Sequence, residues 1–331
     1  MKGKLLLRQL LLLLLLCALF LGFNAGLYGW LTGRLANNFS DAAQPKMVDV
    51  GRYLPFEAAS DLPRIETDFR LAGELPVLDG AAALVPVYAA VIHNLYPEGS
   101  VTYRGGVFSD DNYYGENFAP DSKMQYRNTV RGFTALVDGT ADVLFSAAPS
   151  REQRAYAQEK GVELVYTPIG LEAFVFFVNS RNPVEGLTAA QIRDIYGGVI
   201  RNWKAVGGPD RPINPVTRLK GSGSQSVMDA FMGERPMAPK SPLALFGGAI
   251  GYSFRFYLMD MVGEAAVKVL SVDGVYPQKE SIRAGTYPLT VPFYAVWRAD
   301  DPNENVPRLV DWLLSAEGQA LIEATGYVPL G

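Results

Sequence analysis

Short apolar strands alternate with helices along most of this chain, and this alternation constrains the fold more than any other feature. The strand-like segments are residues 75–78, 101–103, 141–145, 173–178, 213–217 and 293–297. The helix-like segments are residues 81–95, 129–138, 151–160, 188–196, 225–231 and 306–325. Strands that alternate with helices across short turns are typical of βαβ units. We therefore predict an α/β protein with a largely parallel sheet.

Composition places the chain among globular proteins. Its 331 residues suffice for about two ordinary domains, and 49% are hydrophobic while 19% are charged. These values exclude a disordered chain and a coiled coil. The formal net charge is −4 and no long Lys/Arg block occurs, so we expect no nucleic-acid partner.

Two residue types that carry much of enzyme chemistry are nearly absent. The chain has one cysteine, Cys17, and one histidine, His93. A single cysteine excludes an intrachain disulfide and a cysteine-based metal site. His93 lies beside Ile92 in a helical pattern and is expected to be structural. We predict no metal, no cofactor and no catalytic residue.

The N-terminus has the pattern of an export signal. Lys2, Lys4 and Arg8 precede an apolar stretch over residues 10–31, which spans about 33 Å as a helix, enough to cross a bilayer. Residues 1–31 are therefore a signal peptide or an uncleaved membrane anchor. Small residues for a cleavage site are hard to place here, which favours the anchor.

Either reading of the N-terminus exports the rest of the chain. Positive charges before the apolar stretch hold the N-terminal end inside, so residues from about 35 onward are extracytoplasmic or periplasmic. Residues 32–74 show no sustained period and are predicted to be a linker.

The best candidate site is a strand–turn–helix junction at residues 218–225. Arg218 ends a strand, Gly221-Ser222-Gly223-Ser224 forms a small-residue turn, and a helix follows at once. Free N–H groups and the helix dipole at such a terminus favour an anion, and an arginine can bind an oxyanion bidentately. The alternative is a helix cap followed by a flexible turn.

Three catalytic or nucleotide-binding motifs do not fit this turn. The Gly-Lys-Ser/Thr of a P-loop is missing, as are the third glycine of a dinucleotide fingerprint and the Gly-x-Ser-x-Gly of hydrolases. A serine hydrolase using Ser222 or Ser224 would also need a histidine partner that we cannot name. A binding site is therefore favoured over an enzyme.

The same turn resembles the phosphate-contacting turn of PstS-like substrate-binding proteins of ABC transporters. Further segments are similar to that family in the same order along the chain. They are residues 168–184, 187–203, 248–252, 287–289 and 313–330. The resemblance extends over about residues 75–331.

This resemblance implies a type II periplasmic-binding-protein-like fold, in which two α/β lobes are joined by two hinge crossovers. The matched segments place lobe one at residues 75–167 plus 289–331 and lobe two at residues 168–288. The N-terminal signal or anchor helix precedes both lobes.

The implied function is capture of an oxyanion, in the first place inorganic phosphate, between the lobes for delivery to an ABC permease. The implied protein is a monomer and not an enzyme. Lobe two would contribute Arg218, Gly221, Ser222, Gly223 and Ser224. Lobe one would contribute Asn128, Thr129, Ser146 and the backbone N–H groups of Ala81 and Ala82.

Lobe one departs from the family pattern at three positions. Ala81 and Ala82 stand where relatives usually carry hydroxyls, and Ala147 stands where phosphate binders tend to place a carboxylate. These losses favour a second hypothesis, a membrane-tethered anion sensor or assembly protein that has lost tight phosphate binding. Glu172, beside the hinge strand, is expected to be solvated or salt-bridged, and the alternative is an acid that lines the cleft.

Overall fold

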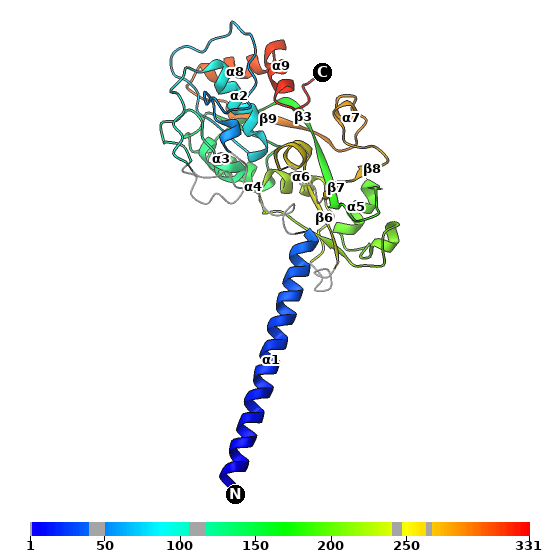
Figure 1. Ribbon diagram of the computed structural model, residues 1–331. Helices are drawn as coiled ribbons and strands as arrows, with labels where there is room; N and C mark the ends of the chain where they lie inside the picture. The colour runs from blue at the N-terminus through cyan, green and yellow to red at the C-terminus, as the bar shows by residue number, and fades with distance from the viewer. Residues whose placement is uncertain (1, 40–49, 106–116, 240–246, 263–266) are drawn as a thin grey trace. The chain divides into compact units, whose positions relative to one another are not determined.

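The computed structural model describes residues 2–39, 50–105, 117–239, 247–262 and 267–331 (Figure 1). The chain divides into two units, Met1–Asp41 and Ala42–Gly331, which are considered separately below.

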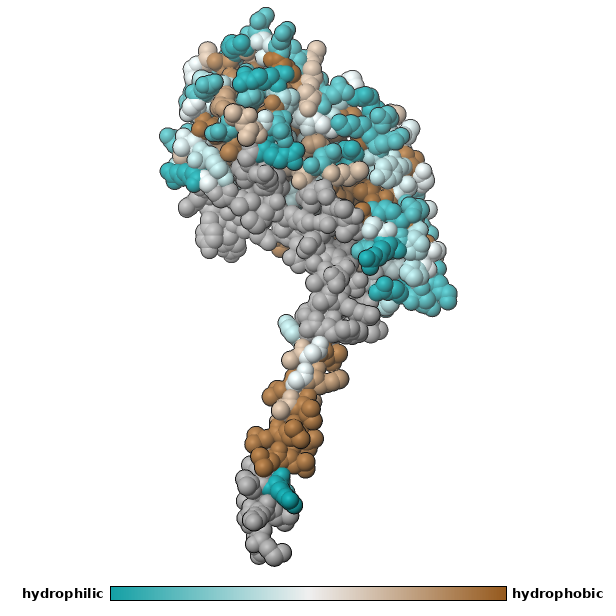
Figure 2. All heavy atoms as spheres, viewed as in Figure 1, coloured by the Kyte–Doolittle hydropathy of each residue, from teal (hydrophilic) through white to brown (hydrophobic). Residues whose placement is uncertain are grey.

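The first unit is one helix, α1 (Lys2–Phe39). Its segment Leu11–Tyr28 is long and apolar enough to cross a membrane by length and composition, and its leucines are exposed in Figure 2. The helix continues to Phe39, beyond residue 31, where the predicted anchor ends, and residues 32–39 contain no proline that would break it.

The second unit contains a seven-stranded sheet in the order β1-β2-β9-β3-β6-β5, with β7 also paired to β3. The strands are β1 (Leu78–Gly80), β2 (Val143–Ser146), β3 (Leu164–Asn179), β5 (Ile213–Pro215), β6 (Gly248–Phe254), β7 (Val267–Val269) and β9 (Thr290–Arg298). A separate two-stranded sheet joins β4 (Gly186–Leu187) to β8 (Ser271–Val272).

The sheet is mixed, so the prediction of a largely parallel sheet is wrong. Only β1–β2 and β5–β6 are parallel within the seven strands, whereas the pairs β2–β9, β9–β3, β3–β6 and β3–β7 are antiparallel. The antiparallel pairs arise because the long strand β3 and the late strand β9 run in opposite directions through the middle of the sheet (Figure 1).

Strand β3 takes part in both halves of the sheet. Its residues 164–173 pair with β9, and its residues 174–178 pair with β6. The register with β9 shifts between Pro168 and Gly170. A Cβ on Gly170 would lie 2.4 Å from Cζ of Phe293, so a side chain at this irregularity would have to displace the buried Phe293 ring.

Helices and helical turns cover the sheet. The α-helices are α2 (Val85–Leu95), α3 (Asn128–Val137), α4 (Arg151–Glu159), α5 (Ala189–Tyr196), α6 (Gly223–Met232), α7 (Lys279–Arg283), α8 (Asn305–Leu314) and α9 (Ala316–Ala324). The shorter or irregular turns are η1 (Val50–Tyr53), η2 (Ala82–Leu84), η3 (Trp203–Val206) and η5 (Tyr257–Val262).

Capping residues in the sequence predicted some helix ends correctly and others incorrectly. Thr188 caps α5 as predicted, in a capping box with Gln191. The single helix predicted over residues 306–325 is two helices, because Ser315 is extended and its side chain caps α9. Helix α3 begins at Asn128, one residue before the expected start.

Part of the predicted linker belongs to the hydrophobic core. Tyr53, Leu54 and Leu62 are buried in the cluster that also contains α2, although residues 40–49 lie outside the described part of the chain. Nδ1 of His93 accepts a hydrogen bond from the N–H of Phe56 at 3.0 Å, which confirms its structural role. The apolar residues of this segment follow neither a helix nor a strand period, so hydrophobic periodicity did not predict that they are buried.

Glu172 is buried at the point where β3 passes from β9 to β6, contrary to the expectation of a solvated or salt-bridged side chain. Its Oε1 accepts the N–H of Ala173 at 2.7 Å, and its Oε2 accepts the N–H of Phe256 at 3.1 Å. Burial raises the pKa of Glu172 to about 7 and Asp260 adds to the rise, against the two N–H groups and Arg255.

We expect Glu172→Gln to change the pH dependence of stability. A carboxyl with a raised pKa binds its proton more tightly in the folded chain, so ionisation destabilises the fold as pH rises from about 4.5 to about 7. The free energy of unfolding of the wild type, relative to the variant, should fall by roughly 3 kcal/mol between pH 4.5 and pH 8.

Urea unfolding of the full chain in detergent at both pH values measures this difference. The exposed Glu163, at the edge of the same strand, provides the matched control as Glu163→Gln. If the free energy of unfolding of the wild type minus that of Glu172→Gln is the same at both pH values, the raised pKa of Glu172 is contradicted.

Candidate functional site

The site lies where the two parallel strand pairs end. Strands β1 and β2 end just before Ala81 and Ala147, and β5 and β6 lead to Arg218 and to the segment after Phe254. Paired parallel strands end at the same edge of a sheet, where ligands of α/β proteins commonly bind. The turns after these strands supply the candidate residues.

The turn before α6 has the geometry of an anion site. Gly221 adopts φ +83°, and Oγ of Ser222 accepts the N–H of Gln225 at 3.3 Å, which caps the helix. The N–H groups of Gly223 and Ser224 lie in the first helical turn, where no intrahelical acceptor exists. The positive end of the α6 helix dipole therefore lies at this turn.

Two side chains anchor the backbone of Arg218. Its N–H donates to Oη of Tyr252 and to Oε1 of Gln225, both at 3.0 Å. Burial raises the pKa of Tyr252 to about 12, so its hydroxyl is neutral at physiological pH. The turn is thereby tied to β6 and to its own helix.

A buried ion pair holds the opposing turns together. Asp79 is fully buried, and its Oδ1 accepts the N–H groups of Gly80 at 2.8 Å and Arg127 at 2.9 Å. Its Oδ2 accepts Nη1 of Arg127 at 2.8 Å. This pair fixes the start of η2 relative to Asn128 and Thr129, which follow Arg127 directly.

The turns enclose a small pocket, called here the polar pocket. It is lined by Ala81, Ala82, Ala83, Asn128, Thr129, Arg218, Ser222, Gly223, Ser224, Ser253, Phe254 and Tyr257. Oγ1 of Thr129 lies 3.7 Å from the position of a Cβ built on Gly223. The structure therefore brings the two predicted halves of the site face to face.

Two predicted residues do not line the polar pocket. Oγ of Ser146 donates to the carbonyl of Ala147 at 2.9 Å and the residue is buried. Gly221 shapes the turn, and a Cβ on it would lie 3.2 Å from Cγ2 of Val130. Conversely, Ser253, Phe254 and Tyr257 were not predicted, and only their position after the segment at 248–252 could have suggested them.

The chemistry of the polar pocket suits an oxyanion. Arg218 supplies positive charge, and Thr129, Ser222 and Ser224 supply hydroxyls beside the free N–H groups of α6. Across the described ranges of the chain, no group of three or more His, Cys, Asp or Glu side chains is placed to hold a metal ion.

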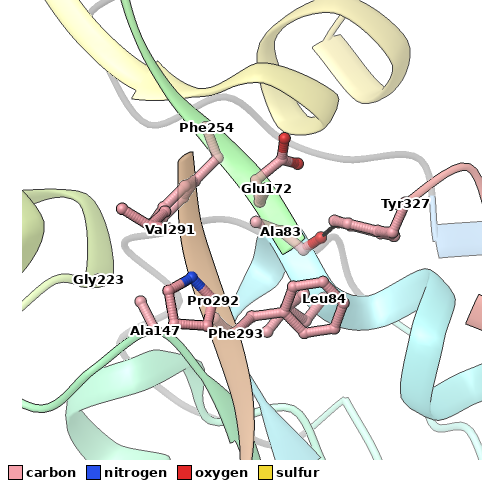
Figure 3. Close-up of a pocket in the computed structure, with 11 residues that line it drawn as sticks. Ala83, Leu84, Ala147, Glu172, Gly223, Phe254, Val291, Pro292, Phe293 and Tyr327 are labelled. Atoms are coloured by element: carbon pink, nitrogen blue, oxygen red, sulfur yellow. Dashed lines mark hydrogen bonds between the residues drawn. The ribbon is translucent and has the colours of Figure 1, made fainter. Parts of the chain in front are cut away.

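A second, apolar pocket adjoins the first (Figure 3). It shares Ala81, Ala83, Gly223 and Phe254 with the polar pocket. Its other lining residues are Leu84, Ala147, Glu172, Val291, Pro292, Phe293 and Tyr327. The two pockets are therefore direct neighbours, separated by these four shared residues.

Comparison with known proteins gives relatives that are similar in sequence over most of their length. The chain is 25% identical over 228 residues to the phosphate-binding protein PstS of Borreliella burgdorferi, covering 63% of this chain and 80% of the relative. It is 27% identical over 293 residues to the protein SphX of Synechococcus elongatus, covering 77% of this chain and 86% of the relative.

Solved structures agree on the architecture. A Clostridium perfringens structure with bound phosphate matches with a TM-score of 0.55 at 23% identity, covering 77% of this chain and 98% of that one. An ABC-type phosphate transport receptor from Vibrio cholerae matches with a TM-score of 0.51 at 22% identity, covering 76% and 99%. The predicted periplasmic-binding-protein-like α/β fold is thereby confirmed.

The family model described as a PBP superfamily domain matches residues 112–317, more than half of the chain. The match includes β3, the Arg218 turn and β9, which form the middle of the sheet and one side of the polar pocket. On this evidence the chain belongs to the PBP superfamily.

Proposed function

We propose that this protein captures an oxyanion, in the first place inorganic phosphate, and delivers it to an ABC permease. The observation that carries the proposal is the polar pocket, where Thr129 faces the N-terminus of α6 beside Arg218. Relatives named phosphate-binding protein PstS support phosphate as the ligand, and their names describe binding proteins rather than enzymes.

Capture would proceed by closure of two lobes about β3 and β9. In this proposal lobe one comprises residues 75–167 plus 289–331, and lobe two comprises residues 168–288. A buried dianion needs nearly all its lone pairs satisfied. Only the closed form brings Thr129 and the α6 terminus to the same anion, so binding would select that form.

Lobe one offers few hydrogen-bond donors to an anion in the polar pocket, and this deficit supports a second candidate function. Ala81 and Ala82 carry no hydroxyl, the N–H of Ala81 already donates to Phe145 at 2.9 Å, and Ser146 is turned to its own neighbour. A tethered anion sensor or assembly protein with weak phosphate affinity fits this deficit. The affinity for phosphate therefore separates the two functions.

We expect Arg218→Ala to weaken phosphate binding roughly 10- to 100-fold, because it removes a charge-assisted contact. Ser224→Ala should weaken it less, since it removes a neutral donor. Calorimetry on the full chain in detergent, stripped of bound anion, measures both effects.

Arg181→Ala removes an exposed arginine of the same lobe outside both pockets and serves as the control. Equal affinities in all four proteins would contradict the assigned site. Millimolar or weaker binding by the wild type would favour the sensor over the transport role.

We further propose that α1 is an uncleaved anchor that holds the binding unit on the extracytoplasmic face as a monomer. The full-length chain should then stay in the membrane fraction after an alkaline carbonate wash. A variant with Leu13→Arg and Leu16→Arg should lose this retention, because each charge near the bilayer centre costs about 2.5–3.5 kcal/mol.

Mass spectrometry of the washed membrane fraction supplies the second readout of anchoring. The expected species begins at the N-terminal end of α1. A shortened protein that has lost this helix and is found in the soluble fraction would establish a cleaved signal instead.

A further inference from the structure

We propose that the apolar pocket receives a short aliphatic substituent on the phosphorus, so that the preferred ligand is an organophosphonate or a small phosphate monoester. This inference rests on the proposed function and specifies its substrate class. The oxygens of the ligand would occupy the polar pocket, and the substituent would extend past Ala81 and Ala83, which line both pockets, into the apolar pocket. Figure 3 shows the residues that line the apolar pocket.

Among the lining residues of the two pockets, most side-chain donors lie on the polar side. Arg218, Thr129 and the α6 terminus lie on the polar side. On the other side, Ala147, Val291 and Phe293 present only carbon from their side chains, and Pro292 has no N–H. An oxygen of inorganic phosphate pointing this way would lose hydration without gaining a side-chain donor, which is costly.

Both polar side chains of the apolar pocket are already engaged. The hydroxyl of Tyr327 donates to the carbonyl of Ala83. Each carboxyl oxygen of Glu172 accepts a backbone N–H, from Ala173 and Phe256 respectively. The ionised form of the Glu172 carboxyl would repel an ionised ligand oxygen, whereas an alkyl group carries no charge to repel.

The far end of the apolar pocket limits the length of the substituent. Leu84, Phe293 and Tyr327 are buried there, and the last two pack ring against ring at 5.0 Å between centroids. Alanine and glycine side chains open the near end, at Ala81, Ala83 and Gly223. The space therefore suits one or two carbon atoms rather than a long chain.

Calorimetry on the full chain in detergent, with inorganic phosphate, methylphosphonate, ethylphosphonate and ethyl phosphate, tests this inference. Each buried CH₂ group gives roughly a fourfold gain in affinity. Ethylphosphonate or ethyl phosphate should therefore bind at least about tenfold more tightly than inorganic phosphate. The comparison of these two ligands identifies a carbon–phosphorus ligand or an ester.

Two variants enlarge Val291, which lines the apolar pocket and is not among the residues of the polar pocket. Val291→Leu and Val291→Met should remove the advantage of the ethyl ligands, while the affinity for inorganic phosphate stays within about threefold of wild type. A loss that is equal for all ligands in both variants would contradict a separate substituent pocket.

The outcomes separate this inference from the proposed function. Phosphate binding that is as tight as, or tighter than, ethylphosphonate binding overturns the inference and leaves oxyanion capture standing. Failure of every phosphorus oxyanion to bind overturns both.

Discussion

The antiparallel pairing of β3 with β9 is the interaction on which the rest of this structure depends. Each strand lies in the middle of the sheet, and β3 alone pairs with strands of both halves. The parallel pairs β1–β2 and β5–β6 are attached on either side of this core. Their ends carry the two sets of turns, so the β3–β9 pair sets how the turns face one another.

The candidate site depends more on turns that are held in place by hydrogen bonds than on a large number of donors. The Asp79–Arg127 pair holds one side, and the contacts of Arg218 with Tyr252 and Gln225 hold the other. Anion binding gains most from donors that are already oriented, because little ordering remains to be done on binding. Such a site can be selective with few side chains, and the adjoining apolar pocket then adds a second basis for selection.

Local signals in the sequence predicted β2, β5, the second half of β3, most of β9, the Thr188 cap and the turn before α6, because each depends on residues close in the chain. They missed β6 and the first half of β3. Features that depend on distant contacts were missed. Tyr53 and Leu54 are buried in the core although the hydrophobic residues around them follow no helix or strand period. Ser253 and Tyr257 line the polar pocket because of the way strand β6 pairs in the sheet. Glu172 could not be placed either, since its burial results from the packing of Phe256 and Tyr327 around β3.

A crystal structure of the protein soaked with a phosphorus oxyanion tests the central claim most directly. The account predicts anion density within hydrogen-bond distance of the N–H groups of Gly223 and Ser224, with Thr129 and Arg218 as further partners. Density at another place on the protein, or an empty polar pocket at a saturating anion concentration in solution, would contradict the claim that these turns form the binding site.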